Sequence, residues 1–163
     1  MIRGIDVALY FISLDPAHKA FNKRKCIQDG RCFYIGSERL NHYMHMAQNI
    51  YIAKYGEPLM DSVFYAYDGG AVDRVVYEKY PELLECGDDA LQIDDDVKKY
   101  LDAIYRALHN ASLEELTILC QEDPEWVDKY YQHGKNKQMD PMAHAAVYRI
   151  MYADMIKVLE KMG

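Results

Sequence analysis

The sequence lacks the motifs that mark the commonest enzyme classes. It contains no Lys-Ser/Thr phosphate loop and no G-x-S-x-G nucleophile elbow. It has no apolar run near the roughly 20 residues that a membrane span needs. Basic residues are also in short supply: 19 Lys and Arg against 26 Asp and Glu give a formal net charge of -7. Because phosphate contacts need a basic surface, this balance argues against a general nucleic-acid binder.

Cysteine is too sparse for a disulfide scaffold. The four cysteines stand at positions 26, 32, 86 and 120 of 163 residues. Arg3 and Asp6 interrupt the only apolar start, so no secretory signal is recognised. We therefore expect a soluble, cytoplasmic protein with reduced thiols and no membrane segment.

Apolar residues and tyrosine are abundant. Half of the residues are hydrophobic and 15 are tyrosines, so a sizeable core is available. Tyrosine suits half-buried faces and contact surfaces, because its ring packs while its hydroxyl still needs a partner. Charge is uneven: residues 82–128 hold 14 acidic and 3 basic residues. Such a run is usually a solvated face, and the alternative is an acidic surface for a basic partner.

Apolar periodicity predicts a mainly α protein. Helices are expected over residues 4–14, 38–55, 71–80, 94–109, 113–121, from 124 onward, and over 142–162. An aromatic run predicts a strand over 62–67, and residues 15–36 are expected to form a loop with one short β-like run. We expect one domain over 1–163, a bundle of about six helices with one or two short strands.

Residues at the expected helix ends support this division. Ser37 is the expected N-cap of the second helix and Gly56 its C-cap. Ser112 and Glu115 fit a capping box, and Asp123 followed by proline is a typical helix start.

One alternative for chemistry is a metal site. Cys26, Cys32, His42 and His45 form a candidate Cys2His2 set. The two histidines are three residues apart and share a helix face. That face lies opposite the predicted core stripe, which favours exposed histidines instead. Five residues between the cysteines is also a looser spacing than structural zinc sites use, so no metal or other cofactor is expected.

Two single residues have both a structural and a functional interpretation. Cys120 lies beside leucines on a short helix, which predicts a buried and inert thiol. Trp126, the sole tryptophan, is either a core anchor or a contact residue.

The order of several motifs resembles the Panacea domain, a family of antitoxin-like and phage-associated proteins. The motifs are Leu40-x-x-Tyr43-Met44-x-Met46-Ala47-Gln48, Tyr55-Gly56-Glu57-Pro58-Leu59, Ala66-Tyr67-Asp68-Gly69 with Val72 and Val75-Val76-Tyr77, Tyr100–Tyr105, Ser112–Leu116, and Pro124-Glu125-Trp126. The likeness spans about residues 5–130. Two departures are Gly70, where the family has proline after glycine, and residues 15–36, which lengthen the link before the second helix.

The resemblance implies a helical, non-enzymatic domain that neutralises a toxin by binding it. It also implies that some members act as protease adaptors that deliver their toxin. As contact residues we expect Tyr65, Tyr67, Asp68 and Trp126. The alternatives are a small metal-dependent enzyme or metal-stabilised protein built on the Cys2His2 set, and a module that self-associates through its tyrosines. The toxin and the oligomeric state do not follow from the sequence.

Overall fold

A computed structural model describes residues 1–28, 30–86, 91–132 and 136–162. Its α-helices are α1 (Gly4–Ser13), α2 (Ile35–Tyr55), α3 (Arg74–Leu83), α4 (Asp95–Leu108), α5 (Leu113–Gln121), α6 (Pro124–Val127), α7 (Ala145–Met151) and α8 (Ala153–Met162). Its strands are β1 (Lys25–Gln28), β2 (Arg31–Tyr34), β3 (Phe64–Tyr67), β4 (Gly70–Asp73) and β5 (Lys137–Gln138). The predicted mainly helical class is confirmed, with more helices and strands than expected.

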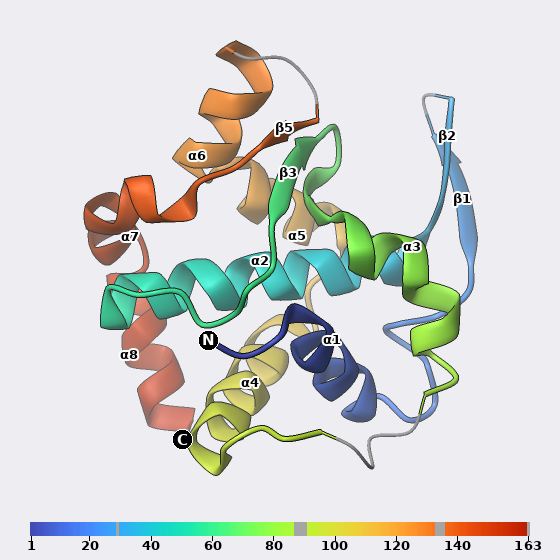
Figure 1. Ribbon diagram of the computed structural model, residues 1–163, viewed down its shortest axis with the longest axis horizontal. Helices are drawn as coiled ribbons and strands as arrows, with labels where there is room; N and C mark the ends of the chain where they lie inside the picture. Colours follow the sequence, from blue (N-terminus) through green and yellow to red (C-terminus); the bar gives the residue numbers. More distant parts are fainter. Residues whose placement is uncertain (29, 87–90, 133–135, 163) are drawn as a thin grey trace.

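Helix α2 runs through the centre of the molecule. Figure 1 shows α1 and α4 on one side of it, the β3 sheet, α5 and α6 on the other, and α7 and α8 at its C-terminal end. The helix is therefore enclosed on several sides, and 16 of its 21 residues are buried. A helix in this position is buried around most of its circumference instead of along one stripe.

The prediction of one polar, solvent-facing side on α2 is wrong for this reason. Asn41, His42, His45 and Asn49 are all buried. Two polar residues of α2 satisfy the backbone of segments that pack on it. Asn41 Oδ1 accepts from the N–H of Asp73 at 2.8 Å, and Gln48 Oε1 accepts from Leu59 and Met60 at 2.9 and 3.1 Å. A buried amide that holds backbone groups in this way avoids the cost of leaving them unpaired.

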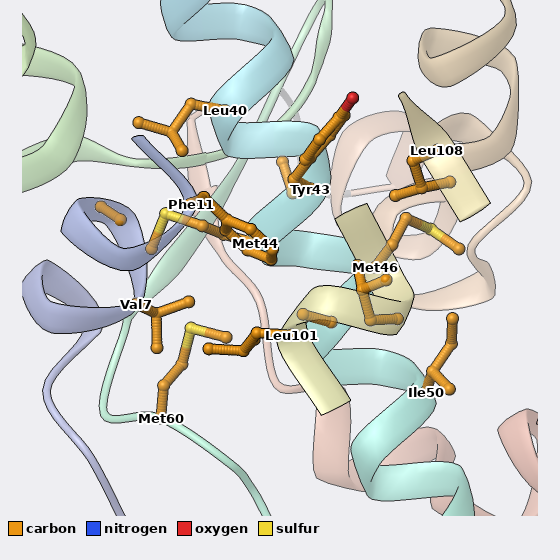
Figure 2. Packing of buried hydrophobic residues seen from close by; sticks show 14 of the residues in the cluster. Val7, Phe11, Leu40, Tyr43, Met44, Met46, Ile50, Met60, Leu101 and Leu108 are labelled. Carbon is orange, nitrogen blue, oxygen red and sulfur yellow. The ribbon is translucent and has the colours of Figure 1, made fainter. Parts of the chain in front are cut away.

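Apolar side chains from distant parts of the chain meet on α2. Figure 2 shows Val7 and Phe11 of α1, Leu101 and Leu108 of α4 and Met60 around the α2 side chains. The ring of Tyr43 receives Phe11 and Phe21 edge-on, with centroids 5.7 and 5.3 Å away. Burying each large side chain contributes about 1.5–3 kcal/mol, so this cluster dominates the packing energy.

The segment after β3 differs from the expected helix over 71–80. Asp68 and Gly69 form the turn, and β4 then pairs with β3 in antiparallel register, Tyr65 with Val72 and Tyr67 with Gly70. Helix α3 starts only at Arg74, where Asp73 Oδ1 accepts the N–H of Val75 and Val76. The first part of the predicted helix is therefore a buried strand. Strand β5 pairs with the other side of β3.

Several predicted helix ends are confirmed. Gly56 ends α2 with φ +72°, Ser112 and Glu115 form a capping box, and Asp123 caps α6. Ser37 is wrong as a cap, because α2 starts two residues earlier and Ser37 is buried in its first turn. Helix α3 continues to Leu83 and includes Pro81, beyond the end expected at residue 80.

The C-terminal segment is not the single helix expected over 142–162. A 3-10 turn, Pro141–His144, leads into α7, and the helix breaks at Tyr152 before α8. Tyr148, within α7, and Tyr152, at the break, are both buried. None of the described helices combines the length and the apolar character that crossing a membrane requires.

Candidate functional site

The loop expected over 15–36 contains a β-hairpin that forms one wall of a cleft. Strands β1 and β2 pair antiparallel from Lys25–Tyr34 to Gln28–Arg31, and the hairpin projects from the body of the molecule (Figure 1). Gly30 at its tip has φ +77°, which a glycine adopts without strain. Before the hairpin, the carboxylate of Asp15 accepts hydrogen bonds from the backbone N–H groups of Lys19, Ala20 and Phe21. These bonds fix the backbone of the segment that leads into β1.

The hairpin cleft lies between this hairpin, the start of α2, the β3–β4 turn and α5, with a volume of about 620 Å3. Its lining residues are Gln28, Arg31, Phe33, Glu38, Asp68, Gly69, Leu113, Glu114, Thr117, Ile118 and Gln121. The walls combine apolar and polar groups, as is typical of recognition sites. Ile118 is half exposed on the α5 wall, while Phe33 is buried at the hairpin wall.

Glu38 is the most buried charged residue of the cleft. It is 6% exposed, and its Oε1 lies 3.1 Å from Nη1 of Arg31, which is partly open to solvent. The guanidinium of Arg31 also covers the ring of Phe33 at 4.7 Å. Glu38 thus joins the first turn of α2 to strand β2.

His42 lies one turn further along α2, behind Glu38. Its Nε2 shares a hydrogen bond with Oγ1 of Thr117 at 3.2 Å, and it lies 3.8 Å from Glu38 Oε2. Burial, with the nearby His45 and Arg39, lowers the pKa of His42 to about 3. The imidazole is therefore neutral near pH 7, so it does not form an ion pair with Glu38 there.

Tyr65 and Tyr67 lie on a neighbouring surface formed by β3. Both side chains are on the half-exposed side of the strand, while Phe64 and Ala66 are buried. The guanidinium of Arg74 lies over the Tyr65 ring at 3.6 Å, and its Nε donates to the Tyr67 hydroxyl at 3.0 Å. The two tyrosines thus contact the same guanidinium, which is attracted to the faces of both rings.

Trp126 is 2% exposed, so it supports the β3–β4 turn from behind. Its Nε1–H donates to the carbonyl of Tyr67 at 3.0 Å, and its ring stacks on Tyr130 at 4.6 Å. The Tyr130 hydroxyl donates to Asp68 at 2.5 Å, and this interaction raises the pKa of Tyr130 to about 12. The structure therefore brings Tyr67, Asp68 and Trp126 together at one turn, with Tyr65 two residues away.

A second buried polar cluster joins α2 to the C-terminal half. Asp123 accepts hydrogen bonds from Asn49 Nδ2 at 2.9 Å and from the Tyr148 hydroxyl at 2.6 Å, besides the N–H of Glu125. His45 Nε2 lies 2.7 Å from the same carboxylate. Burial alone would raise the pKa of Asp123, but the hydrogen bonds and the charge of this cluster lower it. The cluster is fully enclosed, so its role is to join helices.

The four residues of the candidate metal set are not brought together. Cys26 pairs with Phe33 and Cys32 with Ile27, so the two thiols point to opposite faces of the hairpin. His42 and His45 are buried inside the molecule instead of exposed, because β4, α5 and α7 cover that face of α2. No cluster of three or more His, Cys, Asp or Glu side chains with metal-binding geometry occurs in the part of the chain that the structure describes. Cys120 is buried as predicted, which raises the pKa of its thiol.

Sequence reasoning identified Asp68 but missed Arg31, Glu38 and Thr117. The one available signal was the pair of opposite charges at Arg31 and Glu38, on either side of a strand-to-helix junction. Comparison of the chain with protein-family profiles, with curated proteins and with solved structures gives no match.

Proposed function

We propose that this chain is a non-enzymatic protein-binding domain, an antitoxin or phage-associated adaptor that neutralises a cognate toxin by direct binding. The motif order that resembles the Panacea domain supports this function. The hairpin cleft is the structural observation that carries it, because it combines an open concave surface, mixed polar and apolar walls and a buried charge. Adaptor activity, in which the bound toxin is delivered to a protease, uses the same contact.

The surface around the cleft is suited to a protein partner. Ile118 on the α5 wall of the cleft is 50% exposed. A stable complex buries about 800 Å2 on each partner, more than the cleft alone, so the contact extends over the neighbouring surfaces. Asp68 lies at the cleft, and Tyr65 and Tyr67 extend the surface along β3. Trp126 contributes by holding the turn, since it is buried.

Co-expression tests this function. The chain is expressed with the reading frame adjacent to its gene, and growth and co-elution on a sizing column are measured. We expect growth rescue and a stable complex. Ile118→Glu should weaken both, whereas Val158→Glu, at a similarly exposed position on the distant helix α8, should weaken neither. Absence of rescue and of any complex with the unaltered chain would reject the proposal.

A second candidate function is self-association. It is favoured by the exposed apolar face of α7. Val147, Ile150 and Met151 are 46%, 82% and 38% exposed and recur at helical spacing on one face. Among the described tyrosines, only Tyr55 and Tyr131 are strongly exposed, so tyrosine-rich faces contribute less than expected. Sedimentation of the unaltered protein and Ile150→Glu distinguishes the cases: a monomer at all micromolar concentrations would reject self-association.

A further inference from the structure

We propose that the outer edge of strand β1 pairs with an extended segment of a partner protein, a strand with apolar and acidic side chains that adds to the β1–β2 hairpin. The apolar side chain at this edge is Ile27. It lies on the face of the hairpin opposite the cleft, because the neighbouring Gln28 and Phe33, which pairs with Cys26, line the cleft. The identity of the partner as a toxin rests on the proposed function, whereas the pairing follows from the geometry and charge of β1.

The backbone groups on this edge of β1 have no partner within the described part of the chain. Strand β1 pairs with β2 alone, and Figure 1 shows it on the outer side of the projecting hairpin. The N–H of Ile35 donates to the carbonyl of Arg24 at 2.8 Å, and hydrogen-bonded pairs alternate with non-bonded pairs along an antiparallel ladder. The N–H and C=O groups of Lys25 and Ile27 therefore point away from β2. They form an open strand edge, which an extended peptide can complete by main-chain hydrogen bonds.

The hairpin is covered on one face only. Phe33 is buried on the cleft side, whereas Ile27 on the other face is 80% exposed beside its exposed cross-strand neighbour, Cys32. Two strands alone are marginally stable in water, and a third strand stabilises them. Strand β1 is in regular register and has neither proline nor a bulge to block its edge. A partner strand there would place a side chain beside Ile27 and cover this apolar surface.

Charge favours an acidic partner. Three basic residues are exposed at the start of β1: Lys23, Arg24 and Lys25. The ion pair of Lys23 with Glu85, at 3.6 Å, joins two exposed side chains and is therefore weak. Residues 23–28 include no acidic residue, so the same strand of a second copy would not offset this charge. A segment with acidic residues beside 23–25 and an apolar residue beside Ile27 complements both features, because cross-strand neighbours of opposite charge or matched apolar character stabilise a sheet.

A synthetic strand tests this pairing without any toxin. The peptide Ac-Thr-Val-Thr-Val-Glu-Asp-Glu-NH2 is added to the 15N-labelled chain, and amide shifts and hydrogen exchange are followed. We expect saturable binding with a Kd on the order of 0.1–1 mM. At saturation, exchange of the N–H groups of Lys25 and Ile27 should slow at least about tenfold, because they gain acceptors. The N–H of Cys26 already bonds to β2, so its exchange should change much less. Absence of protection at Lys25 and Ile27 would overturn the proposal.

A second peptide separates strand pairing from attraction between charges. It has the same sequence with its four central amides N-methylated, so it keeps every side chain and loses the main-chain donors. We expect it to bind at least about tenfold more weakly. Equal binding of the two peptides would overturn the proposal. So would a short single-stranded DNA that shifts these amides when the unmodified peptide does not, because the surface would then bind nucleic acid.

Two variants assign the binding to the β1 edge. Ile27→Pro removes an N–H that points away from β2, so the β1–β2 ladder keeps its hydrogen bonds. Ile27→Thr keeps the backbone and removes the apolar side chain. We expect at least about tenfold weaker binding of the unmodified peptide to Ile27→Pro and about threefold weaker binding to Ile27→Thr. Val158→Thr, at an exposed position on α8, should bind the peptide as the unaltered chain does.

Unchanged binding by a folded Ile27→Pro would reject this edge as the site. If Ile27→Pro does not fold, Ile27→Thr and the N-methylated peptide decide the question. Protection of Lys25 and Ile27 by the peptide without any toxin complex would reject only the proposed function. A toxin complex with a peptide that protects neither residue would reject only the strand site.

Discussion

His45 and Asp123 are 78 residues apart in the chain, and their side chains meet at 2.7 Å in the interior. Neither side chain is exposed to solvent. The contact joins the middle of α2 to the cap of α6, and Tyr148 adds α7 to the same carboxylate. Asp123 therefore has two structural roles, as a helix cap and as the centre of a buried cluster.

Removing the charge of Asp123 should strongly destabilise the fold. Asp123→Asn cannot accept as many hydrogen bonds and leaves His45, Asn49 and Tyr148 poorly paired in the interior. We expect a loss of about 3–5 kcal/mol in the free energy of unfolding, measured by urea denaturation. Asp154→Asn, on the exposed start of α8, should change it by less than about 0.5 kcal/mol. If the two variants change the free energy of unfolding by similar amounts, the buried cluster contributes little to stability.

The buried ring of His42 should make stability depend on pH. Its pKa is about 3 in the folded chain and about 6.5 in the unfolded chain, so between these values the unfolded chain binds more protons. The free energy of unfolding should therefore fall as pH is lowered from about 6.5 toward 3, by up to about 1.4 kcal/mol per pH unit from this residue.

Chemical denaturation at pH 7.5 and 5.5 measures this effect. His42→Gln should show a smaller difference between the two pH values than the unaltered chain. His18→Gln, at an exposed position, should show the same difference as the unaltered chain. An identical pH dependence in all three proteins would contradict the assignment to His42.

A side chain at Gly70 should be poorly tolerated. Gly70 has φ +132°, and a Cβ there would lie 2.7 Å from Cε1 of His42. Gly70→Ala should therefore cost more than the about 1–3 kcal/mol of backbone strain alone, measured as a change in the free energy of unfolding. Gly30→Ala is the matched control, because Gly30 also has positive φ but no atom within 4 Å of its Cβ position. If Gly70→Ala and Gly30→Ala lower the free energy of unfolding equally, the contact with His42 does not destabilise the protein.

Chelation should leave the fold unchanged. Cys26 and Cys32 point to opposite faces of the hairpin, and His42 and His45 are buried, so no shared ion holds them. We expect the same Tm for the protein purified without chelator before and after dialysis against EDTA. A lower Tm after dialysis, restored by added zinc, would revive the metal-site alternative.

Local chemistry predicted the parts of the fold that depend on neighbouring residues. The capping box at Ser112, the Asp123 cap and the Gly56 end each need only a few adjacent residues, and all three are confirmed. The polar side of α2 was expected to face solvent. The periodicity of the sequence shows which side of a helix is polar, but it does not show whether other elements pack over that side. That side is covered by β4, α5 and α7, which follow α2 in the chain and which no local pattern in α2 can indicate.

The candidate site was predictable only in part for a related reason. Asp68 was identified from a strand followed by a glycine turn, and the structure places it at the cleft. Glu38 and Arg31 were missed because their pairing depends on how the hairpin folds back over α2. Two strands of four residues carry little sequence signal, so the hairpin was expected to be a loop.

The enclosure of α2 also constrains how the chain reaches its native state. The segments that cover this helix come from both ends of the chain, α1 (Gly4–Ser13) before it and α7 and α8 (Ala145–Met162) long after it. A fragment that ends before α7 would lack Tyr148, which donates a hydrogen bond to Asp123 beside His45 and Asn49. Contacts of such long sequence separation are slow to form, because much of the chain must be ordered before they stabilise it. We therefore expect the protein to fold cooperatively. The packing of α2 should become stable only when the whole sequence, including the C-terminal helices, is present.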